Sequence, residues 1–430
     1  MKAIITSGYY RVEKGKTYTH LFGRNEDGTK AHLIVRHEPY FFSGDPDTPH
    51  KLVNMPEVVR VERDGTSILG EKLYRITTRH PFDVPKVRSK LKDTYEADIP
   101  FVLRTKVDAG VRFGVEYPED KPILTVQDLQ PCDVPIQPRI MYIDIENFEG
   151  KKSPNPKKAG EEVVSITMLF HPDTYYVITT ADANKTILKE AIRAQGIKGK
   201  IYLKKAKNEH ELFALYTKIY QRFDPDIVAG WYVVQYDRAY LENRAKARRY
   251  PIPDHKRAGW IDLMAGYDIL TKNRLPSRTL EYCAQKTLGY GKLDIKIVFQ
   301  RVVEDLSKKT LSDKIKERIE RIKKWIEEVR QGSKLAKMIK RLYYEMPEGL
   351  ILYNMIDVVL CKEINEKKKI IEYFLYLAKT SGRFVDELVS MPREGEYPDK
   401  YTFSSSKLAD GYFLSILEGR LRLPSNRRGM

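Results

Sequence analysis

Two acidic residues, separated by one isoleucine, lie in a short stretch that has the composition of a β-strand. They are Asp144 and Glu146, in the run 140–146. Side chains at positions i and i+2 of a strand project from the same face, so both carboxylates point one way while Ile143 and Ile145 face the other. Two neighbouring carboxylates repel each other unless a cation neutralises them, and their oxygens suit Mg²⁺ or Mn²⁺. A solvated acidic pair on an edge strand is the alternative interpretation.

Three further residues complete the set of groups needed for phosphodiester hydrolysis with two metal ions. Asp237 follows a predicted strand, at a helix start, where a capping aspartate is the alternative. Tyr353 and Asp357 are four residues apart, hence on one face of a predicted helix, where an ordinary exposed pair is the alternative. With the strand pair they supply four carboxylates and one phenol. The expected metal ligands are Asp144, Glu146, Asp237 and Asp357, and the Tyr353 hydroxyl is expected to orient the attacking water.

The elements around these residues follow the order of a ribonuclease-H-like fold. Three strand candidates come in succession, and alternating helices and strands follow them, which predicts a mixed sheet with flanking helices. Asn208 is the predicted cap of the first long helix, which carries apolar residues along one face. The predicted strands are 140–146, 163–170, 175–180, 200–204 and 226–230, and the predicted helices are 208–223 and 237–249.

The remaining segments predict an α/β protein with three parts. Residues 1–135 contain short β segments, turn signals and one helix after Pro85 that runs through Leu91, which indicates an α+β amino-terminal domain. Residues 136–370 form the predicted ribonuclease-H-like domain, and 371–430 form a helical segment expected to pack back on the amino-terminal domain. An apolar stripe from Leu311 to Val329 predicts an amphipathic helix within 305–345. Two further helices are predicted over 352–377 and 404–422.

Composition favours a polyanionic partner and an intracellular location. The chain of 430 residues carries 76 Lys and Arg against 59 Asp and Glu, a formal net charge of +17, which favours nucleic acid over an unpartnered basic surface. Cys132, Cys283 and Cys361 are far apart, so they form neither a disulfide framework nor a zinc motif. No apolar run reaches the length of a membrane span. These features predict a cytoplasmic protein that binds no membrane.

The candidate residues resemble the exonuclease motifs of the family B DNA polymerases, most closely the archaeal branch. Asp144-Ile145-Glu146 resembles the first motif, DxE. Tyr236-Asp237, followed by Tyr240-Leu241, resembles the second, and Tyr353 with Asp357 resembles the third, YxxxD. The resemblance covers nearly the whole chain. It implies a proofreading 3′–5′ exonuclease that uses two Mg²⁺ or Mn²⁺ ions, preceded by a template-binding domain.

The amino-terminal part resembles the uracil-binding region of the archaeal enzymes. Asp98-Ile99-Pro100-Phe101, followed by Arg104, is similar to their DIPFxxR segment. In these relatives the region captures a template uracil ahead of synthesis. From the residues alone, an ordinary sheet core in which proline and phenylalanine only pack is the alternative. The resemblance implies a uracil pocket formed by Tyr10, Pro39, Val84, Ile99, Pro100, Phe101 and Arg104.

The sequence departs from the family pattern in four places. Tyr232 stands where the second motif has Asn, and Tyr236 replaces Phe; both positions lie near the single-stranded end in the family, so both tyrosines are expected to contact DNA. The stretch 246–260 is too short for the β-hairpin that many relatives insert there. The stretch 305–345 is longer than the usual connection. After Leu423-Pro424 neither a SLYPS-like segment nor a DTD motif follows, so this chain alone is not expected to extend a primer.

Several functional readings stay open at this point. The chain is either a fragment of a longer polymerase or one piece of a split polymerase. Its expected partners are DNA (a primer 3′ end and single-stranded template), the palm, fingers and thumb in the same polypeptide or in a separate subunit, and a sliding clamp. The alternatives are a free-standing DNA repair exonuclease and a catalytically silent nucleic-acid-binding subunit.

Overall fold

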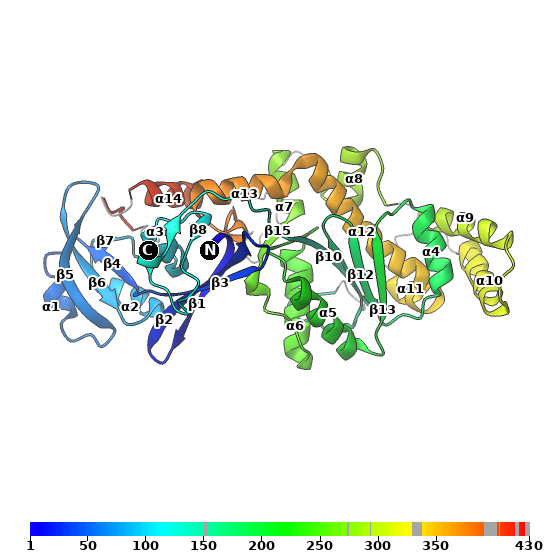
Figure 1. The fold of residues 1–430 in the computed structure, drawn as a ribbon, viewed down its shortest axis with the longest axis horizontal. Coiled ribbons are helices and arrows are strands. Elements are labelled where there is room, and N and C mark those ends of the chain that lie inside the picture. The colour runs from blue at the N-terminus through cyan, green and yellow to red at the C-terminus, as the bar shows by residue number, and fades with distance from the viewer. Residues whose placement is uncertain are drawn as a thin grey trace.

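The strand that carries Asp144 and Glu146 lies inside a six-stranded mixed sheet (Figure 1). The computed structural model describes residues 1–148, 154–272, 275–292, 294–328, 338–390, 402–403, 405–417 and 421–425. In spatial order the sheet contains β13 (Lys200–Lys205), β12 (Thr174–Thr179), β11 (Val163–Phe170), β10 (Ile140–Asn147), β14 (Ile227–Gly230) and β15 (Gly259–Asp262). β10, β11 and β12 pair antiparallel, whereas β13, β14 and β15 each join their neighbour in parallel. The predicted ribonuclease-H-like order is therefore confirmed.

Helices cover both faces of this sheet, because β10 alternates its side chains between two apolar clusters. Ile143 and Ile145 pack with residues of α5 (Glu209–Phe223) and α6 (Ala239–Arg248). Tyr142 packs on the opposite face, with residues of α4 (Lys185–Ala194) and α12 (Pro347–Lys368). The predicted cap of α5 is confirmed, since the N–H of Glu211 donates to Asn208 Oδ1 at 3.0 Å. The acidic side chains of β10 consequently face α12.

The amino-terminal part is built from two further sheets. One contains β3 (Lys30–Arg36), β2 (Lys16–Asn25), β1 (Lys2–Glu13), β8 (Gly114–Glu116) and β9 (Gln130–Pro131) in spatial order. The other contains β5 (Val58–Thr66), β6 (Lys72–Thr78), β4 (Tyr40–Ser43) and β7 (Thr94–Tyr95). The short helices are α1 (Thr48–Leu52), α2 (Val84–Arg88) and α3 (Phe101–Asp108). This α+β part lies at one end of the molecule, and α9 and α10 lie at the other (Figure 1).

The amphipathic helix predicted within 305–345 is confirmed as α10, although it covers only part of that stretch, and its Ile319, Ile322 and Ile326 are buried. The described residues form α9 (Ile295–Ser307), α10 (Asp313–Glu328) and α11 (Ile339–Glu345), and Val329 lies outside them. A new helix begins after Ser312, whose carbonyl accepts the N–H groups of the third and fourth residues that follow. The break lets α10 pack against α9 and bury its own apolar stripe, which one continuous helix cannot do.

Three other helix predictions need correction at their ends. The helix after Pro85 ends at Arg88. The helix predicted over 352–377 is two helices, α12 and α13 (Ile370–Ser381), because Lys369 adopts a left-handed conformation with φ of 57°. The closing helix, α14 (Ser405–Ile416), is shorter than predicted. Two more helices, α7 (Leu263–Leu270) and α8 (Leu280–Leu288), lie between β15 and α9 in the chain. No helix among the described residues combines the length and apolar content that crossing a bilayer requires.

Residues 421–425 return to the amino-terminal part instead of continuing the helix. Arg422 forms a parallel bridge with Ser67, and Pro424 forms an antiparallel bridge with Tyr95. The Arg422 guanidinium also lies 4.5 Å from the centre of the Phe42 ring. The end of the described chain thus packs against the sheet that contains β4 and β7.

A buried ion network joins the amino-terminal sheet to the six-stranded sheet. Asp226, just before β14, accepts two hydrogen bonds from the Arg24 guanidinium at 2.8 and 3.0 Å, and Lys30 donates to it at 3.0 Å. The backbone N–H of Arg139 donates to the same carboxylate at 2.8 Å. Asp226 is completely buried, so this carboxylate neutralises two cations that water cannot reach.

We expect Asp226→Ala to lower the free energy of unfolding by about 3–5 kcal/mol, because it removes the carboxylate that pairs with the buried Arg24 guanidinium and leaves Lys30 with Asp224 at 3.7 Å. Urea unfolding measures this change. Asp182→Ala is the matched control: this carboxylate also pairs with a lysine but is 87% exposed, so its loss should cost less than about 0.5 kcal/mol. Equal effects of both variants would contradict a structural role of the buried network.

Candidate metal centre

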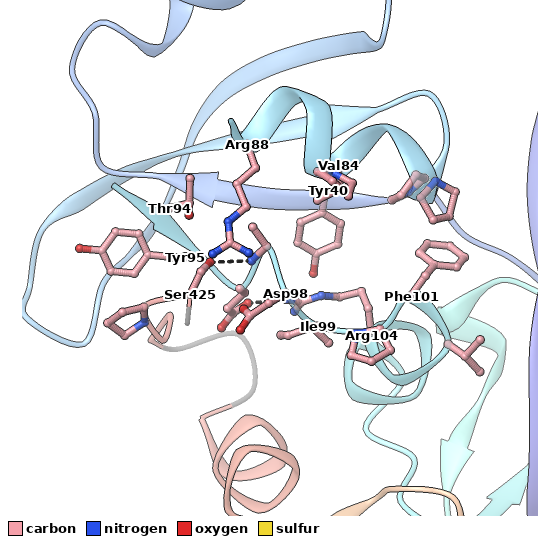
Figure 2. A pocket seen from close by; sticks show the side chains of 18 of the residues that line it. Tyr40, Val84, Arg88, Thr94, Tyr95, Asp98, Ile99, Phe101, Arg104 and Ser425 are labelled. Atoms are coloured by element: carbon pink, nitrogen blue, oxygen red, sulfur yellow. Dashed lines mark hydrogen bonds and ion pairs between the residues drawn. The ribbon is translucent and has the colours of Figure 1, made fainter. Parts of the chain in front are cut away.

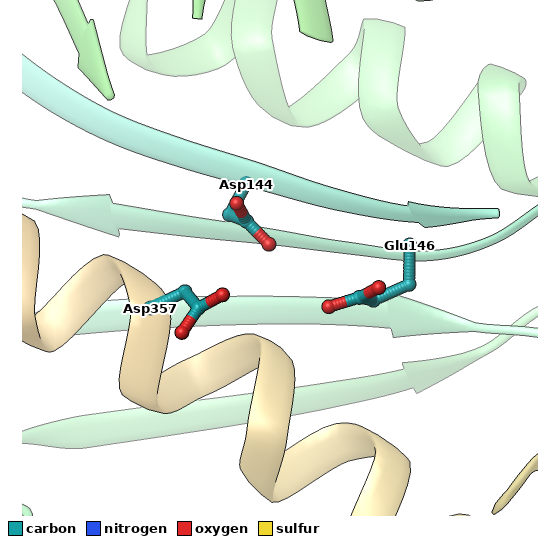
Figure 3. A group of neighbouring side chains, drawn as sticks. All are labelled: Asp144, Glu146 and Asp357. Atoms are coloured by element: carbon teal, nitrogen blue, oxygen red, sulfur yellow. The ribbon is translucent and has the colours of Figure 1, made fainter. Parts of the chain in front are cut away.

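Three of the predicted carboxylates meet between β10 and α12. Asp144 and Glu146 project from the strand and Asp357 projects from the helix toward them (Figure 3). One oxygen of each lies within 4.8 Å of the oxygens of the other two. Strand alternation aligns the first two, and the crossing of the helix over the sheet supplies the third. The exposed-pair interpretations of both motifs are wrong, since Glu146 and Asp357 are buried and Asp144 is half-buried.

The electrostatics of this cluster favour a bound cation. Burial raises the pKa of Asp144 well above its ordinary value, and the charges of Asp357, Asp237 and Glu146 add to the rise. Burial also raises the pKa of Asp357, and the ammonium of Lys292 opposes the rise. Asp357 Oδ1 is buried and has no hydrogen-bond partner among the residues that the structure describes. Carboxylate oxygens in this state fit a hard divalent cation, which would relieve the repulsion.

Lys292 is a member of the site that the sequence did not indicate. Its ammonium donates to Asp357 Oδ2 at 2.5 Å and to the Tyr353 hydroxyl at 2.9 Å. Although burial opposes it, the charge of Asp357 raises the pKa of Lys292, so the side chain is a permanent cation beside the carboxylates. No local pattern marks this lysine, because its partners are 61 and 65 residues further along the chain.

Asn354 is a second such residue, and it holds Asp144 in place. Its side-chain N–H donates to Asp144 Oδ2 at 2.6 Å. Its amide oxygen accepts the hydroxyls of Ser165 and Thr167 on β11, at 2.9 and 2.6 Å. These hydroxyls determine which end of the amide faces the carboxylate. The sequence signal that could have indicated Asn354 is a polar residue inside the apolar run of α12. The structure leaves this residue no exposed surface.

Asp237 lies beside the cluster but is not one of the three converging carboxylates. It sits in the π-helical turn η3 (Val234–Arg238), where the predicted helix cap does not form, and its Oδ1 accepts the N–H of Ile145 at 3.0 Å. Burial raises its pKa to about 8, even though this N–H favours the ionised form. The structure thus places Asp237 beside the backbone of β10, at Ile145, which lies between Asp144 and Glu146 in the sequence.

The two tyrosines of the second motif occupy different environments. Tyr236 is half-buried and donates its hydroxyl to Asn147 Oδ1 at 2.9 Å, next to Glu146. Tyr232 adopts a left-handed conformation with φ of 62°, which an asparagine tolerates better than a tyrosine. Its N–H donates at 3.2 Å to Asp262, which also caps α7. A tyrosine thus occupies a backbone conformation at position 232 that suits an asparagine.

All seven residues of the predicted uracil pocket line one cavity of about 1580 Å³ in the amino-terminal part (Figure 2). Val84, Ile99 and Phe101 contribute apolar walls. Arg104 is almost completely buried and pairs with Glu96 at 2.6 Å, so it braces the wall. Sequence reasoning missed the other lining residues, among them Phe384, Pro424 and Ser425, which arrive from distant parts of the chain.

Comparison with known proteins identifies the region that carries the centre. Residues 92–274 match a family model described as DNA polymerase family B, exonuclease domain. This region is similar to the exonuclease domain of the family B DNA polymerases. The match contains Asp144, Glu146 and Asp237, and it ends before Tyr353 and Asp357.

The proteins that this chain resembles are DNA polymerases. The chain is 26% identical over 194 residues to a DNA polymerase delta catalytic subunit of Dictyostelium discoideum, covering 40% of the chain and 17% of that protein. It is 23% identical over 263 residues to a DNA polymerase of Desulfurococcus sp. (strain Tok), covering 56% and 29%. A family B DNA polymerase of Pyrobaculum calidifontis has the same fold, with a TM-score of 0.69 at 18% identity over 100% of the chain and 52% of that structure. The chain spans less than a third of the length of these two curated relatives.

The raised pKa values predict that the metal-free domain loses stability as pH rises. Between about pH 4 and pH 8 an unfolded Asp237 is ionised while the folded one still holds its proton, so stability falls by at most about 1.4 kcal/mol per pH unit for this group. Asp237→Asn keeps an acceptor for Ile145 and should flatten this decline. Urea unfolding in EDTA at pH 5 and pH 8 measures the difference. The exposed variant Asp305→Asn is the control, and an identical decline in both variants would contradict the assignment.

Proposed function

We propose that this chain is a divalent-metal-dependent 3′–5′ exonuclease that acts on DNA, and that it serves as the proofreading part of a family B polymerase. The observation that carries the proposal is the convergence of Asp144, Glu146 and Asp357 on one point. Three carboxylates on a rigid strand and helix would be costly to keep together without a cation to bind. The family match and the polymerase relatives support DNA as the substrate.

Mg²⁺ is the proposed ion, with Mn²⁺ as a substitute, because the donors are all carboxylate oxygens. Asp144, Glu146 and Asp357 would hold one ion, and Asp237 is the proposed fourth ligand of a two-ion site. The bound ions would supply Lewis acidity that activates water and stabilises the departing 3′ oxygen.

The protein side chains supply orientation and charge around this centre. The Tyr353 hydroxyl accepts from Lys292, so its own proton is available to orient an attacking water at the phosphorus. The ammonium of Lys292 would offset the charge that develops on the phosphoryl oxygens. Asn354 keeps one oxygen of Asp144 engaged and thereby limits the rotation of that carboxylate. Tyr236, bonded beside Glu146, and Tyr232 are the proposed contacts of the single-stranded end.

The proposed partners follow from the relatives, which are whole DNA polymerases. We propose that the chain works with a primer 3′ end, single-stranded template and the polymerising domains, in one polypeptide or as a separate subunit. The amino-terminal part favours this reading over a free-standing repair nuclease, because its sheets and the ion network at Asp226 join it firmly to the exonuclease domain.

Replacing Asp144 and Glu146 together by Ala should lower the rate of strand shortening by at least about 10³-fold, because the centre loses two of its carboxylates. The metal-free variant should fold at least as stably as the parent, since removing like charges relieves repulsion. The measurement follows a 5′-labelled single strand with Mg²⁺ and with EDTA. Asp305→Ala is the matched control. Undiminished digestion by the double variant would contradict the proposal, and no digestion by the parent would favour a silent binding subunit.

We also propose that the amino-terminal cavity binds uracil in single-stranded DNA. The specific observation is that all seven predicted residues line it together. Val84 and Phe101 form apolar walls, and Tyr10 lies edge-on to Phe101 with ring centres 5.6 Å apart. Thymine carries one methyl group more than uracil, so a stiff wall can reject it by a steric clash.

Uracil should therefore be preferred over thymine by about 10- to 200-fold, the range available to one carbon group. Competition binding at fixed salt between oligonucleotides that differ at one base measures this ratio. Val84→Gln should abolish the preference by filling the cavity, whereas Val59→Gln, at a 53% exposed position of β5 outside the cavity lining, should keep it. Equal affinity for both bases would leave only packing as the role of these residues.

A further inference from the structure

An aromatic cluster lies next to the carboxylates and has no part in the mechanism above. It consists of Phe148, which directly follows β10, and Tyr343 and Tyr344, from α11. The Phe148 and Tyr344 rings are nearly parallel, at 12° with centres 6.3 Å apart. Tyr343 stands edge-on to both, at 5.0 Å from Phe148 and 4.9 Å from Tyr344. We call these three rings the Phe148 cluster.

The Phe148 cluster lies on the same face of the sheet as the metal centre. Phe148 follows Glu146 by two residues and Asp144 by four, so alternation directs all three side chains to one side. Packing agrees, because Phe148 belongs with Tyr142 to the apolar cluster on the α12 side, and Ile145 belongs to the opposite one. Two residues of a strand span about 7 Å, so the first ring stands close to the last carboxylate.

Apolar packing explains only part of this cluster. Phe148 and Tyr343 are half-buried and pack against the core, as ordinary core residues do. Tyr344 is different: it is 64% exposed, although its ring is held by two aromatic neighbours. An exposed ring that is already oriented loses little side-chain freedom when it binds a flat partner.

We propose that the Phe148 cluster binds a base of the DNA strand whose 3′ end enters the metal centre, with the base stacked on Tyr344. The inference rests on the proposed exonuclease function and extends it to a specific subsite. A nuclease that removes nucleotides from any sequence must bind single strands without reading them, and stacking on an aromatic ring does this because every base has a flat π face. The occupant is thus a nucleobase of single-stranded DNA, one or more nucleotides away from the terminal phosphate.

The subsite also assigns a role to the extra helical segment. α11 packs against α12, the helix that carries Asp357, and its two tyrosines contact Phe148, two residues after Glu146. Arg341 is committed to Glu345 and Glu328, at 2.6 Å each, so this cation does not dominate the surface near the rings. Stacking, and not phosphate binding, is the interaction that the cluster offers.

The experiment measures DNA binding in the Asp144→Ala, Glu146→Ala background, which binds the strand without digesting it. Adding Tyr344→Ala should weaken the affinity for a single-stranded oligonucleotide by about 5- to 100-fold at fixed salt. Tyr344→Phe should bind like the background, because it keeps the ring. Tyr376→Ala is the matched control, since this tyrosine of α13 is also 64% exposed. 2-Aminopurine placed near the 3′ end should lose its stacking-dependent quenching only with Tyr344→Ala.

A second measurement separates this inference from the proposed function. The p-nitrophenyl ester of thymidine 5′-phosphate reaches the metal centre without a strand, so Tyr344→Ala in the otherwise unaltered chain should hydrolyse it at the parent rate. Failure of the parent to hydrolyse any substrate would overturn the exonuclease proposal. Intact hydrolysis together with equal DNA affinity in Tyr344→Ala and Tyr376→Ala would overturn the stacking subsite alone.

Discussion

Repulsion among carboxylates is the constraint on which the rest of this structure depends. Asp144, Glu146 and Asp357 are held with oxygens within 4.8 Å of one another in surroundings that exclude most water. Such an arrangement persists only when the backbone is fixed by other interactions, because the side chains alone would separate or take up protons. The six-stranded sheet and α12 provide that fixed backbone. The raised pKa values of Asp144 and Asp357 reflect the free energy needed to keep these groups ionised there.

Polar contacts inside the sheet–helix interface transmit this rigidity to the acidic groups. The amide of Asn354 connects Asp144 to two hydroxyls of β11. Asp237 accepts the backbone N–H of Ile145 on β10. Lys292 donates to Asp357 and neutralises part of the negative charge of the carboxylates. Each of these groups is fully engaged, so the centre has few ways to relax except by binding a cation. A site prepared in this manner suits catalysis, which depends on groups that do not reorganise during the reaction.

The two ends of the molecule are coupled to this centre by different means. The network at Asp226 joins the amino-terminal sheet to the strand beside β10. At the opposite end α11 brings two tyrosines to Phe148. Residues 421–425 return to the amino-terminal part and complete the wall of its cavity with Pro424 and Ser425. The amino-terminal cavity and the carboxylate centre therefore share one connected framework.

The sequence by itself determined five of the six strands of the sheet, the face of β10 that carries Asp144 and Glu146, and the pairing of Tyr353 with Asp357, because these follow from local periodicity, but it did not predict β15. It did not determine where helices break: α9 and α10 separate to pack on each other, and Lys369 divides α12 from α13. Tertiary structure alone brought Lys292 to Asp357 and turned the Asn354 amide toward Asp144. It also placed Asp237 beside the backbone of β10 at Ile145, and not at a helix cap. Each of these contacts joins residues more than 60 positions apart, and no local pattern of residue types encodes a distance of that kind.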